Sequence, residues 1–203
     1  MKPFPFVLGT DIVHLVRWEV AGSPIRIVRL AQRILHPKEY ASLRGRHPDV
    51  WGFLKQAGLN DNNVHQACCE AQEKPATDAY DNRHISPKTL RKVRNYLGGR
   101  WAAKEAARKA WGATLLGFKD IRVTSDNEGS ERSTATSAVK VLCQPCTFMP
   151  DNGATLPSQE GRLSISHDGD YAVATVIAEP LSEEIKGYLQ ARLRSTSSAL
   201  PSS

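Results

Sequence analysis

One long helix constrains the fold of this 203-residue chain more than any other feature. Ser86 and Pro87 form a helix start, because serine caps free backbone N–H groups and proline suits the first helical position. Gly112 is a suitable end, and Gly98 with Gly99 predicts a kink or a close approach by another segment. Closely spaced alanines permit tight packing, so we expect this helix to be central. The alanines are Ala102, Ala103, Ala106, Ala107 and Ala110.

The same helix carries unusually many charges. Five charged residues lie in the segment GRWAAKEAARKAWG: Arg100, Lys104, Glu105, Arg108 and Lys109. Helical residues share a face only when they are three or four positions apart, so these five cannot all point one way, although Glu105 and Lys109 can. A solvated face with one ion pair would account for them, but charges on a central helix need partners.

Strands and shorter helices are predicted on either side of the long helix. Apolar alternation predicts strands at residues 4–13, 118–123 and 138–142, and a β-hairpin at 162–177 around a turn at 167–170. Helical spacing is present at residues 24–43, with a break at His36–Pro37, and again from about Ser182. The first strand is expected to end on Asp11, and the hairpin turn to hold His167.

The chain is most simply one domain covering residues 1–194. Polar stretches without a sustained period predict loop-like insertions near 45–82 and 130–159, and a disordered tail at 195–203. No run approaches the roughly 20 apolar residues of a membrane span, so we expect no membrane partner. The N-terminus resembles neither a secretory nor a transit segment, which leaves a mitochondrial or a cytoplasmic location open. A net charge of +6 favours acidic partners.

Three kinds of side chain are candidates for chemistry. Asp11 and Glu105 are carboxylates placed by regular elements, and with phosphate oxygens and water they would make the oxygen shell that Mg²⁺ prefers. A histidine in a hairpin turn has little core to fill, which favours a functional role for His167. Cys143 and Cys146 have a spacing that could serve zinc, but these two and Cys68 and Cys69 are expected to be ordinary reduced thiols.

The segments GTDIV, GRWAAKEAARKAWG and RLSISHDGDYAVATVI occur in this order along the chain. Together they resemble the three signature segments of the holo-acyl-carrier-protein synthase type of 4'-phosphopantetheinyl transferase. The resemblance covers about two thirds of the chain and leaves out residues 45–82, part of residues 130–159, and the tail. It implies an α+β fold, with a small, largely antiparallel sheet wrapped around the long helix, and a homotrimer with sites between subunits.

The resemblance also implies an activity, which is transfer of the phosphopantetheine arm of coenzyme A to a serine of an acyl carrier protein, with Mg²⁺. Asp11 and Glu105 match the family's metal ligands, and further residues match its coenzyme A and carrier-protein contacts. The coenzyme A residues are Arg100, Lys109, His167, Ser166 and, less securely, Arg91 and Lys92. The carrier-docking residues are Arg17, Arg26 and Arg29.

This chain departs from the family pattern at two positions besides the insertions. His14 stands where many relatives have an acidic residue, and Arg108 stands at a position that is often small or hydroxylated. Two other readings remain open. The pair His167–Asp168 is reminiscent of HD-type metal phosphohydrolases, and the basic segment LRKVRNYLGGR would suit a nucleic-acid-binding module, although no aromatic platform accompanies it.

Overall fold

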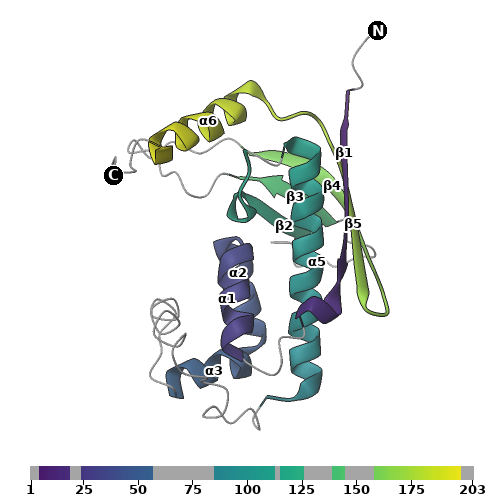
Figure 1. Ribbon diagram of the computed structural model, residues 1–203, viewed down its shortest axis with the longest axis vertical. Helices are drawn as coiled ribbons and strands as arrows, with labels where there is room; N and C mark the ends of the chain where they lie inside the picture. The colour runs from purple at the N-terminus through teal and green to yellow at the C-terminus, as the bar shows by residue number, and fades with distance from the viewer. Residues whose placement is uncertain are drawn as a thin grey trace, which may run out of the picture.

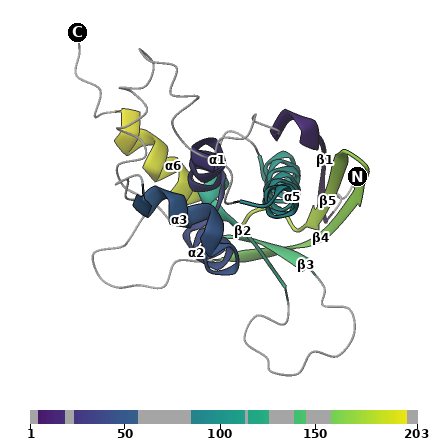
Figure 2. The ribbon, with the colours of Figure 1, turned by 90° about the horizontal axis from the view of Figure 1, so that it is seen from below.

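The computed structural model describes residues 5–18, 24–56, 85–112, 115–125, 139–144 and 158–197. Five antiparallel strands form one sheet in the order β1-β5-β4-β3-β2. This sheet curves around helix α5 (Pro87–Trp111), which is seen end-on in the hollow of the sheet in Figure 2. The predicted α+β fold with a central helix is therefore confirmed.

Figure 1 shows the order of the elements along the chain. The strands are β1 (Val7–His14), β2 (Ile121–Ser125), β3 (Val139–Cys143), β4 (Gln159–Asp168) and β5 (Tyr171–Ala178). The helices besides α5 are α1 (Pro24–Ile34), α2 (Pro37–Arg46), α3 (Pro48–Gln56) and α6 (Glu183–Ser197). Two short 3₁₀ segments are η1 (Leu15–Trp18) and η3 (Phe118–Asp120). In the described part of the chain, no helix combines the length and the apolar character that crossing a membrane requires.

Helix α5 begins and ends where the sequence predicts. The Ser86 hydroxyl accepts a hydrogen bond from the backbone N–H of Thr89 at 3.1 Å, and Gly112 lies just beyond the last helical residue. The helix runs through Gly98 and Gly99 without a break, so the glycines serve close packing. A methyl group at Gly98 would lie 2.2 Å from Leu15 Cδ2.

The strand β1 packs against α5 at very short range. A Cβ atom on Gly9 would lie 1.9 Å from the backbone oxygen of Ala106, so only glycine fits at this position. On the helix side, the alanines from Ala102 to Ala107 have no exposed surface. Small residues on both elements thus allow the strand backbone to lie directly on the helix.

A second apolar cluster joins α1, α2 and α3 to the first half of α5. It includes Val28, Ala31, Ile34, Leu35, Leu43, Val50, Trp51, Val93 and Leu97. Helix α3 contradicts the loop that we expected from residue 45 onward. Val50 and Trp51 are buried on the inner face of this helix. The helix is only nine residues long, so its apolar pattern is too short to stand out from the polar residues around it.

Other predicted boundaries also shift. The strand expected at residue 118 begins only at Ile121, because the Asp120 carboxylate accepts the Gly117 N–H at 2.8 Å and closes a 3₁₀ turn. Strand β1 continues beyond Asp11 to His14, since all eight of its residues pair with β5. The hairpin turn is confined to Gly169–Asp170, because Asp168 still pairs with Tyr171.

Helix α6 continues to Ser197, into the tail that we expected to be disordered. It is held to η3, just before β2, by Arg192, whose two terminal nitrogens each lie 2.7 Å from an oxygen of the buried Asp120 carboxylate. Residues 198–203, the bulk of both predicted insertions (57–84, 126–138 and 145–157), and Cys68, Cys69 and Cys146 lie outside the described residues.

Candidate functional site

The first part of the candidate site is an ion pair between β1 and α5. Alternation along β1 turns Asp11 toward the helix, together with Gly9 and Val13. The Lys109 ammonium lies 2.8 Å from Asp11 Oδ1 and also donates to the Thr10 backbone oxygen at 2.9 Å. The Lys109 side chain is 51% exposed and that of Asp11 is 15% exposed, so the pair borders solvent.

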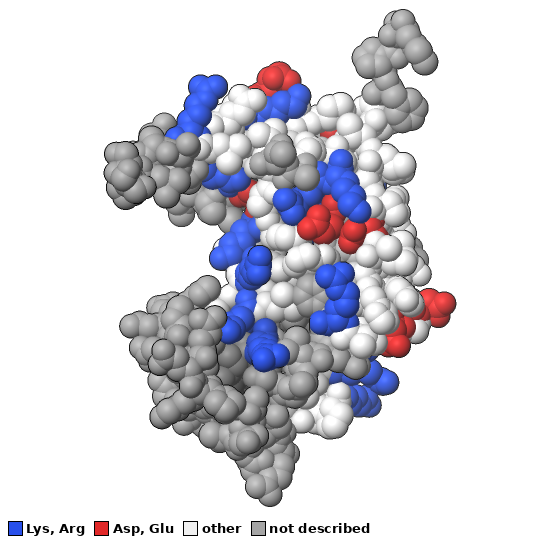
Figure 3. Space-filling view, viewed as in Figure 1, with Lys and Arg blue, Asp and Glu red and all other residues white. Residues whose placement is uncertain are grey.

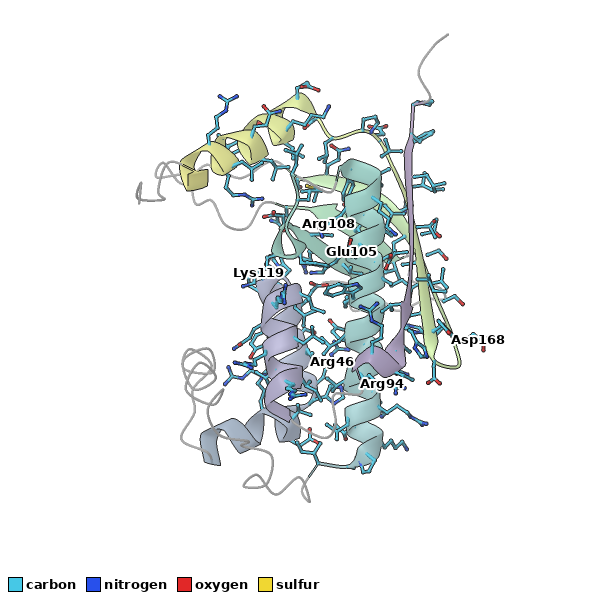
Figure 4. All side chains as sticks on the ribbon, in the orientation of Figure 1. Arg46, Arg94, Glu105, Arg108, Lys119 and Asp168 are labelled. Atoms are coloured by element: carbon cyan, nitrogen blue, oxygen red, sulfur yellow. The ribbon has the colours of Figure 1, made fainter. Side chains whose placement is uncertain are left out.

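Glu105 lies one helical turn before Lys109 and faces the same side of α5. Its Oε1 accepts a hydrogen bond from a terminal nitrogen of Arg108 at 3.1 Å. The Arg108 Nε donates to the Leu116 backbone oxygen at 2.9 Å, and the guanidinium lies over the Phe118 ring at 5.2 Å. In Figure 4, Glu105 and Arg108 lie side by side on α5. Arg108, which departs from the family pattern, thus orients Glu105.

These four residues form what we call the carboxylate cluster: Asp11, Glu105, Arg108 and Lys109. Each carboxylate has one basic partner, so the cluster is neutral overall and borders solvent. Among the described residues, no three His, Cys, Asp or Glu side chains gather at one point that could hold a metal ion. Two carboxylates are nevertheless a usual protein contribution to Mg²⁺, which takes its other ligands from phosphates and water. The donor set of the cluster fits that ion when a phosphorylated ligand is bound.

Arg100 faces away from the carboxylate cluster. It precedes Lys109 by nine positions, about two and a half turns of an α-helix, so the two side chains leave α5 in opposite directions. The Arg100 guanidinium lies over the Tyr96 ring at 4.5 Å, and its Nε is 3.1 Å from Glu39 Oε1. The direction of that Nε–H does not suit a hydrogen bond, and the atom is buried without one.

Glu39, on α2, is the centre of a buried network that the sequence analysis missed. Its side chain is 3% exposed, and its carboxylate accepts the backbone N–H of His36 at 2.9 Å and of Val123 at 3.1 Å. The fully buried Lys104 ammonium donates to Glu39 Oε2 at 2.5 Å, and to the backbone oxygens of Ile34 and Phe118. This network fixes α2 and β2 against α5.

A sequence signal for Glu39 does exist. It stands at the third position of α2, where a glutamate side chain reaches back to the cap residue. The cap here is His36, whose Nδ1 accepts the Lys38 N–H at 3.2 Å. The capping box is usually recognised by a Ser or Thr at the cap position, and this helix has a histidine there. Burial lowers the pKa of His36 below its ordinary value; Glu39 opposes this shift and Lys104, Arg122 and Lys38 add to it.

The two hairpin candidates lie on opposite faces of the sheet. His167 lies in strand β4 rather than in the turn, and its ring approaches Gly99, where a Cβ would be 3.1 Å from His167 Cε1. Ser166 pairs with the exposed Val173, so it points to the outer face, away from α5. The structure therefore brings His167, but not Ser166, next to the helix.

The remaining basic candidates are separate from these clusters. Arg91 and Lys92 are exposed in the first turns of α5, Arg17 is exposed in η1, and Arg26 is exposed on α1 with the half-buried Arg29 one turn later. Figure 3 shows Lys and Arg side chains spread over the face in view, with acidic side chains in small groups beside them. None of these five residues makes an ion pair with another described residue.

Cys143 is the one described cysteine, and it is a free, buried thiol. Burial raises its pKa to about 12, with a smaller contribution from Asp120 in the same direction. Such a thiol is protonated at neutral pH and is a poor nucleophile and metal ligand. For Cys143, the expected structural role is consistent with this environment.

Comparison with known proteins identifies the family. The sequence model of the 4'-phosphopantetheinyl transferase superfamily matches residues 7–176. The chain is 35% identical over 181 residues to 4'-phosphopantetheinyl transferase B, mitochondrial, of Aspergillus fumigatus, covering 87% of this chain and 95% of that protein. It is also 36% identical over 87 residues to the holo-[acyl-carrier-protein] synthase of Streptococcus thermophilus, covering 42% of this chain and 57% of that protein.

Among solved structures, a holo-(acyl-carrier-protein) synthase from Bacillus anthracis in complex with coenzyme A has a TM-score of 0.43 and 21% identity, covering 86% of this chain and 96% of that one. A likeness at that score adds no weight to the assignment, which depends on the family match and on the fungal relative. Both of these span most of the chain, and the family match contains the first two signature segments and all but the last residue of the third. The chain belongs to the 4'-phosphopantetheinyl transferase superfamily.

Proposed function

We propose that this chain transfers the 4'-phosphopantetheine arm of coenzyme A to a serine of an apo acyl carrier protein and releases adenosine 3',5'-bisphosphate. Membership of the superfamily supports the reaction class. The observation that carries the proposal is the carboxylate cluster, in which Asp11 and Glu105 face one side of α5 with a basic partner each. Such a site can bind a metal and a pyrophosphate together.

The metal in this proposal is Mg²⁺, which Asp11 and Glu105 would hold. Once bound, it would stabilise negative charge on the pyrophosphate. If Asp11 bound the metal, Lys109 would give up part of its pairing with Asp11, and its half-exposed ammonium would become available to a phosphate oxygen. Arg108 keeps Glu105 in a fixed orientation throughout.

The reaction itself requires positioning more than covalent help from the protein. The serine oxygen forms a bond to the phosphorus that carries the pantetheine arm, and the bond from this phosphorus to the bridging pyrophosphate oxygen breaks. The leaving adenosine 3',5'-bisphosphate takes the electron pair, and the serine proton passes to a base at the site. Basic side chains that meet the leaving phosphates lower the barrier by stabilising this developing charge.

We further propose that the enzyme is a homotrimer whose sites combine two copies. Arg100 and Lys109 leave α5 in opposite directions, so a compact ligand at one of them needs a second copy to reach the other. The outer face of β1 and β5 also presents a row of exposed apolar side chains that suits an interface between copies. Their exposed fractions are 65% for Leu8, 61% for Ile12, 49% for Ile177, 49% for Tyr171 and 37% for Val173.

The acidic partner in this proposal docks on Arg17, Arg26 and Arg29, with the exposed Arg33 beside them on α1. Acyl carrier proteins of the kind implied by the family are acidic, and the net charge of +6 favours such a partner. The name of the fungal relative places that relative in mitochondria, and we propose the same compartment for this chain. Subcellular fractionation of the tagged protein tests this location.

The direct test is to incubate the protein with coenzyme A, Mg²⁺ and an apo carrier protein, and to weigh the carrier by mass spectrometry. The expected result is a mass gain of one phosphopantetheine group and equimolar adenosine 3',5'-bisphosphate. An unchanged carrier mass, with a carrier whose serine is modified by another transferase as the control, would refute the proposal. Omitting Mg²⁺ in the presence of a chelator should abolish the gain.

No observation supports either the HD-type metal phosphohydrolase or the nucleic-acid-binding module. His167 and Asp168 are neighbours in a strand, so their side chains point to opposite faces of the sheet and cannot act as a paired ligand set. In Figure 4, Asp168 lies at the tip of the hairpin, away from Glu105. In the basic segment, Val93 and Leu97 are buried and Arg94 lies 3.9 Å from Asp170, which makes much of it part of the packed fold.

A further inference from the structure

Two arginines from different helices hold the short segment between α5 and β2, residues 115–120. A terminal nitrogen of Arg192, on α6, donates to the Leu115 backbone oxygen at 3.1 Å, and the Arg108 Nε, on α5, donates to the Leu116 backbone oxygen at 2.9 Å. Figure 1 shows α6 at the same end of the molecule as the C-terminal end of α5. The two arginines therefore bind neighbouring peptide groups of one segment, each from its own helix.

The same segment ends on Asp120, which Arg192 also binds. The two terminal nitrogens of Arg192 each lie 2.7 Å from one oxygen of the Asp120 carboxylate. The Asp120 side chain is 2% exposed and that of Arg192 is 20% exposed, so this two-point pair is largely shielded from water. The Asp120 Oδ2 also accepts the Gly117 N–H at 2.8 Å. A planar fork that meets a carboxylate at two points permits few orientations, so Arg192 fixes the segment directly at Leu115 and again through Asp120.

Helix α6 itself is fixed to the core and to the sheet. Its inner residues Ile185 and Leu189 are buried in the core that also contains Leu116. The Ser182 hydroxyl accepts the Ile185 N–H at 3.3 Å at the start of the helix, and the Gln159 side chain on β4 accepts the Ser182 N–H at 2.9 Å. The position of Arg192 is therefore set by packing that does not involve the segment 115–120 alone.

Arg108 connects this segment to Glu105. The Arg108 guanidinium lies over the Phe118 ring at 5.2 Å, its Nε binds the Leu116 oxygen, and one terminal nitrogen donates to Glu105 Oε1 at 3.1 Å. Two of these three contacts belong to the segment that Arg192 holds. Because a guanidinium is planar and rigid, the backbone oxygen and the ring that fix its plane also determine where its terminal donor lies. A shift of the segment would therefore shift the Glu105 carboxylate.

We propose that Arg192 is a positioning residue, which acts through residues 115–118 and Arg108 on the Glu105 carboxylate. The inference rests on the proposed function, in which Glu105 is a metal ligand. Arg108 occupies Oε1 of Glu105, and among the described residues no group donates to Oε2, so the orientation set by Arg108 decides how Oε2 is presented to a metal. Mg²⁺ requires near-ideal octahedral geometry, so a small rotation of this carboxylate should weaken metal binding.

The test measures metal affinity directly, with the full chain, Mn²⁺ as the probe and saturating coenzyme A. Electron paramagnetic resonance detects free Mn²⁺, so it reports binding without turnover. Arg192→Lys keeps the charge and loses the planar fork, and it should raise the Mn²⁺ dissociation constant about fivefold. The Mg²⁺ concentration for half-maximal rate should rise by a similar factor, while KM for the carrier protein stays unchanged. Arg194→Lys is the matched control, because it makes the same change at an exposed arginine of the same helix.

An Arg108→Leu background separates a positioning role from a structural one. In that background the path to Glu105 is already broken, so adding Arg192→Lys should leave the Mn²⁺ dissociation constant unchanged. A further increase of the same size as in the unmodified chain would overturn the proposal, since Arg192 would then act on the site by another route. Circular dichroism verifies folding. If Arg192→Lys does not fold, the paired change Asp120→Asn, Arg192→Gln takes its place, because it removes both charges of the pair together and leaves neither unpaired.

Wild-type Mn²⁺ affinity in Arg192→Lys, or an equal weakening in Arg194→Lys, would also refute the positioning role. The carrier mass assay separates the two proposals. A protein that modifies the carrier but keeps its Mn²⁺ affinity in Arg192→Lys refutes the positioning role alone. A protein that modifies no carrier, but whose Mn²⁺ affinity depends on Arg192 through Arg108, refutes the transfer reaction alone. A wild-type protein that binds no Mn²⁺ beside coenzyme A refutes the metal assignment and the positioning role together.

Discussion

The Lys109 ammonium lies 2.8 Å from the Asp11 carboxylate and connects the edge strand β1 to the central helix α5. An ion pair this exposed contributes little to stability, in general less than about 1 kcal/mol. The proposed function gives this pair another use, since Lys109, which neutralises Asp11 in the free protein, would become available to a phosphate if Asp11 bound a metal.

Asp11→Asn tests this use. The change keeps the size of the side chain and removes the anionic metal ligand, so kcat/KM for carrier modification should fall by at least about a hundredfold while the melting temperature stays nearly constant. The measurement is the initial rate across a Mg²⁺ titration. Asp168→Asn, the same change at the hairpin tip, is the control. Wild-type rates at limiting Mg²⁺ in Asp11→Asn would refute the metal assignment.

Reversing the charge of the proposed docking arginines should change only the kinetic response to the carrier protein. The double variant Arg26→Glu, Arg29→Glu should raise KM for the carrier about tenfold or more at low salt, because long-range attraction sets the encounter rate and is screened by ions. KM for coenzyme A should stay unchanged. An unaltered carrier KM at low salt would make these arginines ordinary surface residues.

If the apolar outer face of β1 and β5 is the interface between copies, a charge placed on it should dissociate the proposed trimer. Ile12→Lys places a charge in the proposed interface, so sedimentation should move from a trimer to a monomer without loss of secondary structure. Leu193→Lys on α6 is the matched control, since Leu193 is 44% exposed and lies away from this face. A trimer that survives Ile12→Lys would place the interface elsewhere.

Two glycine substitutions should differ sharply in their effect on stability. Gly9→Ala forces a methyl group to 1.9 Å from a backbone oxygen that cannot move away, which should cost at least about 3 kcal/mol of unfolding free energy. In Gly99→Ala, the new methyl group meets the exposed His167 side chain at 3.1 Å and Ile165 at an ordinary contact distance of 3.8 Å, and alanine favours the helix by about 1 kcal/mol. Urea denaturation should therefore show little change for Gly99→Ala, and comparable losses in both would contradict this packing.

His36 predicts a dependence of stability on pH. Its folded-state pKa is lower than its ordinary value of 6.5, so between these two values the unfolded chain binds more protons. The contribution of His36 to the free energy of unfolding should therefore be greatest above about pH 6.5. It should decrease as the pH falls below that value, by at most about 1.4 kcal/mol per pH unit. Protonation also removes the Nδ1 acceptor of the α2 cap. His36→Asn keeps a capping side chain that does not titrate, and it should flatten the profile between pH 5 and 7, measured by urea denaturation.

The sequence predicted those features of the fold and of the site that depend on local patterns. The limits of α5 follow from Ser86, Pro87 and Gly112, and the family segments led to Asp11 and Glu105, which do face the same side of that helix. Glu39 was missed, because its role arises from contacts between elements distant in the sequence. The direction of Ser166 was missed for a related reason, since only the pairing register decides which strand residues face the helix.

The same register has a consequence for how the protein is made. Val7 pairs with Ala178, so β1 can pair with its sheet neighbour only after β5 has been synthesised. Closing so long a loop is entropically costly and slows folding. Until then, β1 exposes unpaired backbone and the apolar side chains of Leu8 and Ile12. Nascent chains of this protein should accordingly depend on chaperones, and any shortened chain that lacks β5 should leave Asp11 on a strand without a sheet.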